Sequence, residues 1–184
     1  MASVPEPVMK EAKETFGRVA YTHKTHEKEA ELKETAGRRI KVTNVAVLGF
    51  TAAAALAAPL IQSTAAAWLA VSSALVALVF AAFQLSFDPA ADATRQRLAA
   101  KSYLALRNDY RRLIADVQAD GLTQSALRDR RDALARELDH LERIAPPTSP
   151  RAYEAARTAL RGTEELTFTD DEYRHLLGSG SDEL

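Results

Sequence analysis

Two long apolar runs stand out in the pattern of hydrophobic and polar positions. They extend over Val45–Ile61 and Ala65–Leu85, and no charged side chain occurs between Asn44 and Ser86. A helix crosses the hydrocarbon core of a bilayer, about 30 Å thick, with roughly 20 predominantly apolar residues. The second run reaches that length, and the first reaches it when its polar end residues lie at the membrane interfaces. The pattern therefore predicts two transmembrane helices.

The same pattern is open to a second interpretation, a buried helical hairpin inside a large soluble core. The rest of the chain opposes it, because mostly charged flanks would have to cover two helices that are apolar on every side. We therefore expect a transmembrane hairpin at 42–86, with its helices at about 43–61 and 65–85.

The connector between the two helices is short. Pro59 and the polar residues Gln62, Ser63 and Thr64 predict a turn that cannot hold a domain, so both helices insert together. Because cytoplasmic flanks carry the excess of Lys and Arg, both termini are expected in the cytoplasm, and Trp68 then suits an interfacial position on the far side. The positive residues that flank the hairpin are Lys33, Arg38, Arg39, Lys41, Arg95, Arg97 and Lys101.

The segment before the hairpin, 1–41, predicts a charged cytoplasmic helix. From about Val8 to Ile40 it is rich in Glu, Lys and Ala, with opposite charges three or four residues apart. The first forty residues hold no apolar core, so no cleaved signal is expected. We expect a largely solvated helix that leads directly into the bilayer and bends near Gly37.

After the hairpin, cap signals and heptad spacing predict a helix with one apolar face. Asp88 followed by Pro89 has the residue types of an N-cap and a first helical position. Gly121 is expected to end this helix as its C′ residue, with Leu122 folding back on Val117. The apolar positions alternate four and three residues apart, as in a heptad seam, and are Ala99, Tyr103, Leu106, Tyr110, Leu113 and Val117.

A second helix begins at Thr123 and ends before Pro146 and Pro147. Its apolar seam faces the previous one across a tight turn at 120–122, which predicts an antiparallel helical stalk below the membrane. The stalk packing is assigned to Tyr103, Leu106, Tyr110, Leu113 and Val117 of the first helix and to Leu127, Leu134, Leu138 and Leu141 of the second.

The last part of the chain predicts less structure. Ser149 and Pro150 begin a short helix to about Arg161, which completes a cytoplasmic region at 87–161. The tail at 162–184 is expected to be poorly ordered, with a short helix over 170–177 as one option. No segment alternates for long enough to argue a strand. The expected fold is an all-α membrane protein, a two-helix transmembrane hairpin with long cytoplasmic helical extensions.

Small or weakly polar residues form a stripe along each apolar helix. In a bilayer, small residues pack helices because they let backbones approach closely. Either both stripes hold the hairpin's own helices together, or one packs the hairpin while the other meets neighbouring protomers or lines an opening. Two helices cannot enclose a channel, so any pore needs an oligomer. The stripe residues are Asn44, Leu48, Thr51, Ala55, Ala58 and Gln62, and Ala66, Ala70, Ser73, Ala77, Ala81 and Gln84.

The composition excludes several kinds of chemistry. The chain has no cysteine, which excludes disulfides, thiolate metal ligands and thiol nucleophiles. It contains no Gly-rich phosphate loop and no serine hydrolase or zinc protease motif. We therefore expect no enzyme activity, no cofactor and no metal. A net charge of −1 gives no support for nucleic-acid binding.

Two sets of polar residues have an alternative functional interpretation. His23 and His26 have a spacing that suits a metal ion, but their Lys- and Glu-rich surroundings favour an exposed pair. The basic clusters 111–112 and 128–131 could hold phosphates, yet their acidic neighbours favour a salt-bridged surface. No carboxylate is expected in an apolar setting that would raise its pKa for acid catalysis.

A set of short motifs accompanies the hairpin. They are Tyr21, Arg38-Arg39, Tyr103-Leu104-Ala105-Leu106, Asp120-Gly121-Leu122-Thr123, Ala145-Pro146-Pro147-Thr148-Ser149 and Arg151-Ala152-Tyr153-Glu154-Ala155-Ala156. Together with the architecture they resemble the SLATT family, the SMODS- and SLOG-associating two-TM effector domain. The resemblance covers roughly Phe16 to Leu160. It supplies no catalytic residues to carry over.

The resemblance implies an antiphage effector that acts on the bacterial inner membrane. It also implies a sensor protein encoded nearby, often acting through a nucleotide second messenger, and an effector that assembles into a homo-oligomeric pore in the lipid bilayer. Two function classes stay open. One is a membrane-disrupting effector, and the other is a passive anchor whose cytoplasmic helices recruit a partner.

Overall fold

The structure is all-helical, as the sequence predicts. It is a computed structural model that describes residues 6–61, 63–119 and 121–162, and these residues contain no strand. The expected option of a helix over 170–177 lies outside them. The helices are α1 (Glu6–Ile61), α2 (Thr64–Ser86), α3 (Pro89–Gln118), α4 (Gln124–Ile144) and α5 (Pro150–Arg161).

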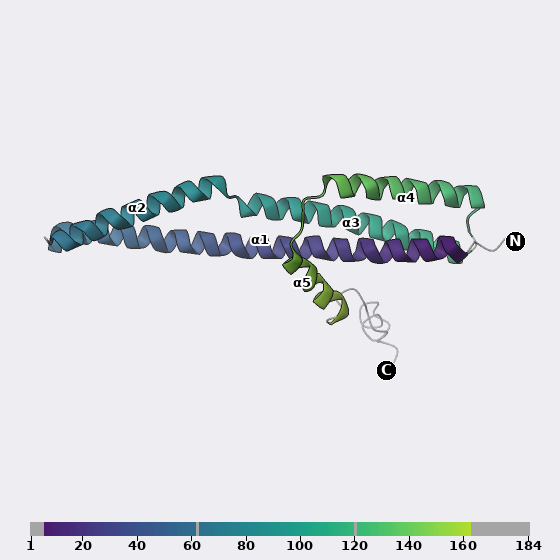
Figure 1. Cartoon of the computed structure of the whole chain (residues 1–184), viewed down its shortest axis with the longest axis horizontal. Helices are drawn as coiled ribbons and strands as arrows, with labels where there is room; N and C mark the ends of the chain where they lie inside the picture. Colours follow the sequence, from purple (N-terminus) through teal and green to yellow (C-terminus); the bar gives the residue numbers. More distant parts are fainter. Residues whose placement is uncertain (1–5, 62, 120, 163–184) are drawn as a thin grey trace, which may run out of the picture.

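Helix α1 runs along the whole molecule, and α2, α3 and α5 each pack directly on it (Figure 1). Its 56 residues span about 84 Å. Helix α2 lies antiparallel along its C-terminal half and α3 along its N-terminal half, while α4 returns along α3. Helix α5 lies on the opposite side of α1 from α4. We call α3, α4, α5 and the N-terminal half of α1 the helical bundle.

Three helices of the bundle begin at side-chain caps. Asp88, Thr123 and Ser149 each accept a backbone N–H from the first turn of α3, α4 and α5. Such caps satisfy donors that have no partner within the helix. The positions of these helix starts are therefore encoded locally.

One expected helix end is wrong, and so is the placement of Pro59 in the connector. Gly121 is the C″ residue of α3 rather than C′, and its N–H donates to the carbonyl oxygen of Asp116 over 3.1 Å, the longer bond of a Schellman motif. Pro59 lies inside α1, which continues to Ile61. Pro59 has no N–H to donate to the carbonyl of Ala55, yet the helix continues past it to Ile61.

The hydrophobic core lies in the bundle, not between α3 and α4 alone. Val19 of α1 is 0% exposed and joins the core, with Phe16 partly buried against it. Leu122 also packs against this cluster. The buried core residues from the other two helices are Tyr103, Leu106, Tyr110, Leu113, Val117, Leu127, Leu134, Leu138 and Leu141.

The N-terminal half of α1 is not the solvated helix that its charges suggest. Buried positions recur along it with heptad spacing and face the equally spaced buried positions of α3. Packing of this kind buries one stripe, and most of the charged residues occupy the remaining positions; Lys24 and Glu29 are charged and buried as well. The buried positions on α1 include Ala12, Val19, His23, His26, Ala30 and Gly37.

Gly37 does not interrupt α1. The helix continues through it into the apolar half. A Cβ at Gly37 would lie 3.3 Å from a ring carbon of Pro89, so the glycine admits the start of α3 close to α1. Its role is close approach rather than a helix break.

Candidate functional site: an apolar hairpin and a buried polar layer

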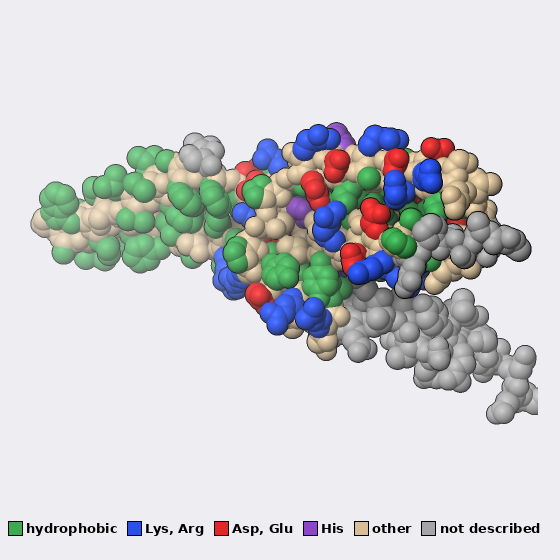
Figure 2. Space-filling model, turned by 45° about the vertical axis from the view of Figure 1, so that its right-hand side comes forward, with side chains coloured by type: hydrophobic (Ala, Val, Ile, Leu, Met, Phe, Trp, Pro, Cys, Tyr) green, Lys and Arg blue, Asp and Glu red, His purple; other side chains and the backbone are tan. Residues whose placement is uncertain are grey.

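The C-terminal half of α1 and all of α2 form an apolar end of the molecule. In Figure 2 hydrophobic side chains cover this end, and the visible charged side chains gather over the bundle. Both helices are long and apolar enough to cross a membrane. Nevertheless, only 0% and 6% of their most apolar stretches are buried within the structure. A core helix of a soluble protein would be mostly buried, so this exposure favours a membrane-spanning pair.

The small-residue stripe of α2 faces α1 within the chain. Ser73 is buried, and its carbonyl oxygen accepts a hydrogen bond from the Thr51 hydroxyl over 3.2 Å. Gln62 lies outside the described residues. Of the other stripe residues, the buried or half-buried members are Asn44, Thr51, Ala58, Ala66, Ala70, Ser73, Ala77 and Gln84, and the exposed members are Leu48, Ala55 and Ala81.

Another set of small residues lies outside the expected stripes. Ala46, Gly49 and Ala53 are exposed, and among the described residues no neighbouring group lies within 4 Å of a Cβ placed on Gly49. They are three and four residues apart and therefore share one face of α1, which we call the outer small face. The small-x-x-x-small spacing of Gly49 and Ala53 is the sequence signal that marks it.

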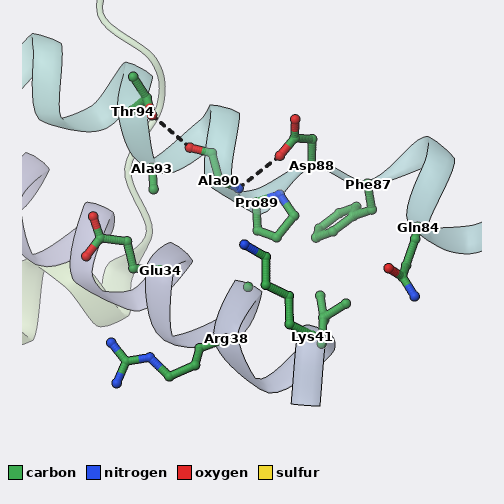
Figure 3. Close-up of a pocket in the computed structure, with 12 residues that line it drawn as sticks. Glu34, Arg38, Lys41, Gln84, Phe87, Asp88, Pro89, Ala90, Ala93 and Thr94 are labelled. Carbon is green, nitrogen blue, oxygen red and sulfur yellow. Dashed lines mark hydrogen bonds between the residues drawn. The ribbon is translucent and has the colours of Figure 1, made fainter. Parts of the chain in front are cut away.

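The hairpin joins the bundle at Phe87 and Asp88, between α2 and α3. A cavity of about 690 Å³ lies between this joint and α1, and we call it the joint cavity (Figure 3). In Figure 3 Lys41 points from α1 toward Pro89, and the ring of Phe87 lies beside them. The cavity thus combines an apolar wall with a positive charge.

A buried polar layer lies between the core of the bundle and the hairpin. The Oε1 atom of Gln96 is 2.6 Å from Nδ1 of His26, and Nε2 of Gln96 donates to the carbonyl oxygen of Pro147 over 2.9 Å. Because Oε1 can only accept, Nδ1 of His26 carries the proton. The His26 ring also stacks on Tyr103, with centroids 5.3 Å apart. Gln96 therefore ties together α1, α3 and the α4–α5 connector.

His23 lies one helical turn before His26 and is equally buried, so the expectation of an exposed histidine pair is wrong. Its Nε2 is 3.7 Å from Oε1 of Glu27, and its Nδ1 has no hydrogen-bond partner among the described residues. Burial lowers the pKa of His23; Glu27 opposes this shift, and the positive charges of Arg107 and Lys24 add to it. The described residues contain no group of three metal-ligating side chains.

Stability of the bundle is expected to fall as the pH drops below about 6.5, the ordinary pKa of His23. The unfolded chain takes up a proton there while the buried imidazole resists protonation, so the unfolded state binds more protons. The contribution of the neutral His23 to the free energy of unfolding is fully present above pH 6.5. It is lost as the pH falls toward the lowered pKa of His23 in the folded state. Thermal melting followed by circular dichroism at about pH 8 and about pH 5.5 measures it.

For His23→Gln, the melting temperatures at the two pH values should differ by less than they do for the wild type. His140 is exposed, so His140→Gln should keep the wild-type difference. Equal pH responses of the wild type and His23→Gln would contradict the assignment.

Glu29 is a buried carboxylate that the sequence pattern does not reveal. It is 6% exposed, and Oε2 accepts the backbone N–H of Ser149 over 3.0 Å as well as the Ser149 hydroxyl. The ammonium of Lys33 lies 3.8 Å from Oε1. These donors replace water around the charge, which makes its burial tolerable. Because Ser149 is the N-cap of α5, Glu29 fixes the start of α5 on α1.

The other end of α5 is also held on α1. Nε of Arg161 donates to the hydroxyl of Tyr21 over 2.7 Å, and the rings of Tyr21 and Tyr153 are 6.5 Å apart. Between these points the face toward α1 consists of small buried residues, which permits close packing. They are Ala152, Ala156 and Ala159.

One arginine of each basic cluster forms an ion pair on the surface. Arg112 is 2.8 Å from Asp109, and Arg131 is 2.8 Å from Asp132. These pairs favour the salt-bridged interpretation over a phosphate site. Exposed pairs of this kind contribute about 0–1 kcal/mol each to stability.

A family model for the SMODS and SLOG-associating 2TM effector domain, family 4, matches residues 9–172. The match includes most of α1 and all of α2 to α5. This is an effector domain of conflict and antiphage systems and is not a known enzyme class. No curated protein and no solved structure matches the chain.

Proposed function

Because the chain belongs to family 4 of the SMODS and SLOG-associating 2TM effector domains, we propose that it is a pore-forming membrane effector of an antiphage system. Copies of the α1–α2 hairpin assemble in the bacterial inner membrane when a partner sensor or a nucleotide signal triggers them. The resulting leak collapses the membrane potential of the infected cell.

The dimensions and charges of the apolar end support this placement. The stretch of α1 from Val42 to Ile61 spans about 30 Å and α2 about 34 Å, close to the thickness of the hydrocarbon core. Both helices lead to the bundle at the same end of the hairpin (Figure 1), and Figure 2 shows Lys and Arg side chains at this end. By the positive-inside rule this end and both termini face the cytoplasm.

The observation that carries the pore proposal is the outer small face. One hairpin encloses no lumen, so several copies must meet. Within the protomer, the α2 stripe already contacts α1 around Thr51 and Ser73. The exposed Ala46, Gly49 and Ala53 leave a surface on which the backbone of a neighbouring helix can approach closely.

The bundle supplies a route by which a trigger reaches the membrane. Helix α1 is continuous from the polar layer around His26 and Glu29 to Ile61. A partner that shifts α3 or α5 against α1 therefore acts on a helix that also forms half of the hairpin. A continuous helix of this kind links a contact with a partner in the bundle to the packing of the hairpin.

Inducible expression with and without the neighbouring genes, followed with a membrane-potential dye, tests the proposal. Depolarisation is expected only when the protein and its triggering partner are both present and active. Membrane-bound protein with no dye response under any trigger would contradict the pore and favour the passive anchor. Recovery of soluble full-length protein without detergent would contradict the hairpin itself.

A further inference from the structure

The joint cavity lies at the level where the apolar surface of the hairpin ends. Helix α1 forms one wall, and the end of α2 with Phe87 and the first turns of α3 form the other (Figure 3). Lys41 is the last charged residue before the apolar block, and Asp88 is the first after it. In a bilayer the cavity therefore opens between the hydrocarbon core and the headgroups.

The walls of the joint cavity have two kinds of chemistry. Ile40, Phe87 and Pro89 provide an apolar part, while Arg38 and Lys41 provide two positive charges. An apolar surface next to cations at a membrane interface matches a phospholipid, which has an acyl chain joined to a phosphate. The volume of about 690 Å³ admits a headgroup and the upper part of a chain.

The acidic side chains at the cavity are already engaged. Glu34 binds Arg97 of α3 through two bonds, one of them 2.8 Å long, and the hydrogen bond from Arg97 lowers the pKa of Glu34. Asp88 caps the first turn of α3. Neither Arg38 nor Lys41 has a carboxylate of a described residue within salt-bridge distance; Arg38 contributes to the lowered pKa of Glu34, and the Lys41 ammonium is the cation that points into the cavity.

We infer that the joint cavity binds an anionic phospholipid of the leaflet next to the bundle. Lys41, which points into the cavity, contacts its phosphate, Arg38 adds positive charge at the cavity edge, and an acyl chain lies against Phe87. Basic recesses between membrane helices at the cytoplasmic side are suited to anionic headgroups. The inference requires the hairpin to lie in a bilayer but does not depend on pore formation. The bound lipid contacts α1 and α3 together, so it stabilises their close approach at Gly37.

Native mass spectrometry of the full-length protein in detergent tests the site. The probes are palmitoyl-oleoyl phosphatidylglycerol, the zwitterionic phosphatidylcholine with the same chains, and inorganic phosphate. We expect preferential retention of phosphatidylglycerol. Arg38→Gln combined with Lys41→Gln should weaken it about 30-fold, since each cation at an anionic surface contributes about a fivefold factor.

Two further variants separate the cavity from general charge attraction. Arg39→Gln with Lys101→Gln removes the same charge from exposed residues that do not line the cavity, and should keep wild-type retention. Ala90 lines the cavity and is exposed, so Ala90→Phe fills the space without changing charge and should abolish retention.

The inference is overturned by equal retention of both lipids, or by equal weakening in both double variants. Phosphatidylglycerol retention that persists in Ala90→Phe would likewise exclude the joint cavity as the binding site. Binding of inorganic phosphate without lipid selectivity would show that the phosphate comes from a soluble source. In each case membrane fractionation of the same variants shows whether the hairpin itself is intact.

Discussion

Replacing Leu106 and Leu113 together with alanine is expected to unfold the helical bundle at physiological temperature. Both side chains are 0% exposed and lie in the centre of the core. Truncation of a buried leucine costs about 2–5 kcal/mol, so the pair costs about 4–10 kcal/mol. That is comparable with the entire free energy of unfolding of a typical domain, about 5–15 kcal/mol.

Circular dichroism of the detergent-solubilised protein measures this effect. The double variant should lose the cooperative melting of the bundle, while the apolar hairpin keeps its helical signal because its backbone bonds are satisfied within each helix. Leu98 is 67% exposed on the same helix, so Leu98→Ala should melt like the wild type. An unchanged melting curve for the double variant would contradict the three-helix core.

Replacing Gly49 and Ala53 together with leucine is expected to abolish depolarisation while leaving the protein level and membrane fraction unchanged. Bulk on the outer small face keeps neighbouring backbones apart. We expect little strain within the protomer, because both positions are exposed and, among the described residues, no group lies within 4 Å of a Cβ on Gly49. The membrane-potential dye and crosslinking of oligomers in membranes give the two readouts.

Control variants separate assembly from folding of the hairpin. Val71 and Val79 are 61% and 64% exposed, so leucine at both positions should be silent. Ser73 is buried and Ala77 half-buried against α1, so leucine at these two positions should lower the protein level instead. Full depolarisation by the Gly49/Ala53 variant would remove the outer small face from the mechanism.

The apolar hairpin and the helix starts of the bundle can be predicted from the sequence because their causes are local. In a bilayer each spanning helix must be long and apolar whatever its neighbours are, because it lies in hydrocarbon and its backbone hydrogen bonds are formed within the helix. Caps at Asp88, Thr123 and Ser149 act on the first turn of the helix that follows. The heptad seam of α3 is visible because Leu and Tyr side chains mark it directly.

The buried polar layer could not be predicted in the same way. His26 is hydrogen-bonded to Gln96, which lies 70 positions further along the sequence. Glu29 accepts a hydrogen bond from Ser149, which lies 120 positions further along. In the sequence these residues stand among lysines and glutamates, a composition typical of a solvated helix. The heptad on α1 is hidden because its positions hold His, Ala and Gly as well as Val19.

The sequence by itself determined the helical class, the two apolar helices, their short connector and the residues that begin α3, α4 and α5. Only the tertiary structure decided that α1 is the central helix, that Glu29 holds α5, and that the small stripe of α2 faces α1 while the outer small face stays open. The physical reason is that a helix presents several faces at once. Which face is buried depends on how neighbouring helices are rotated about their axes, and that follows from contacts between segments far apart in the chain.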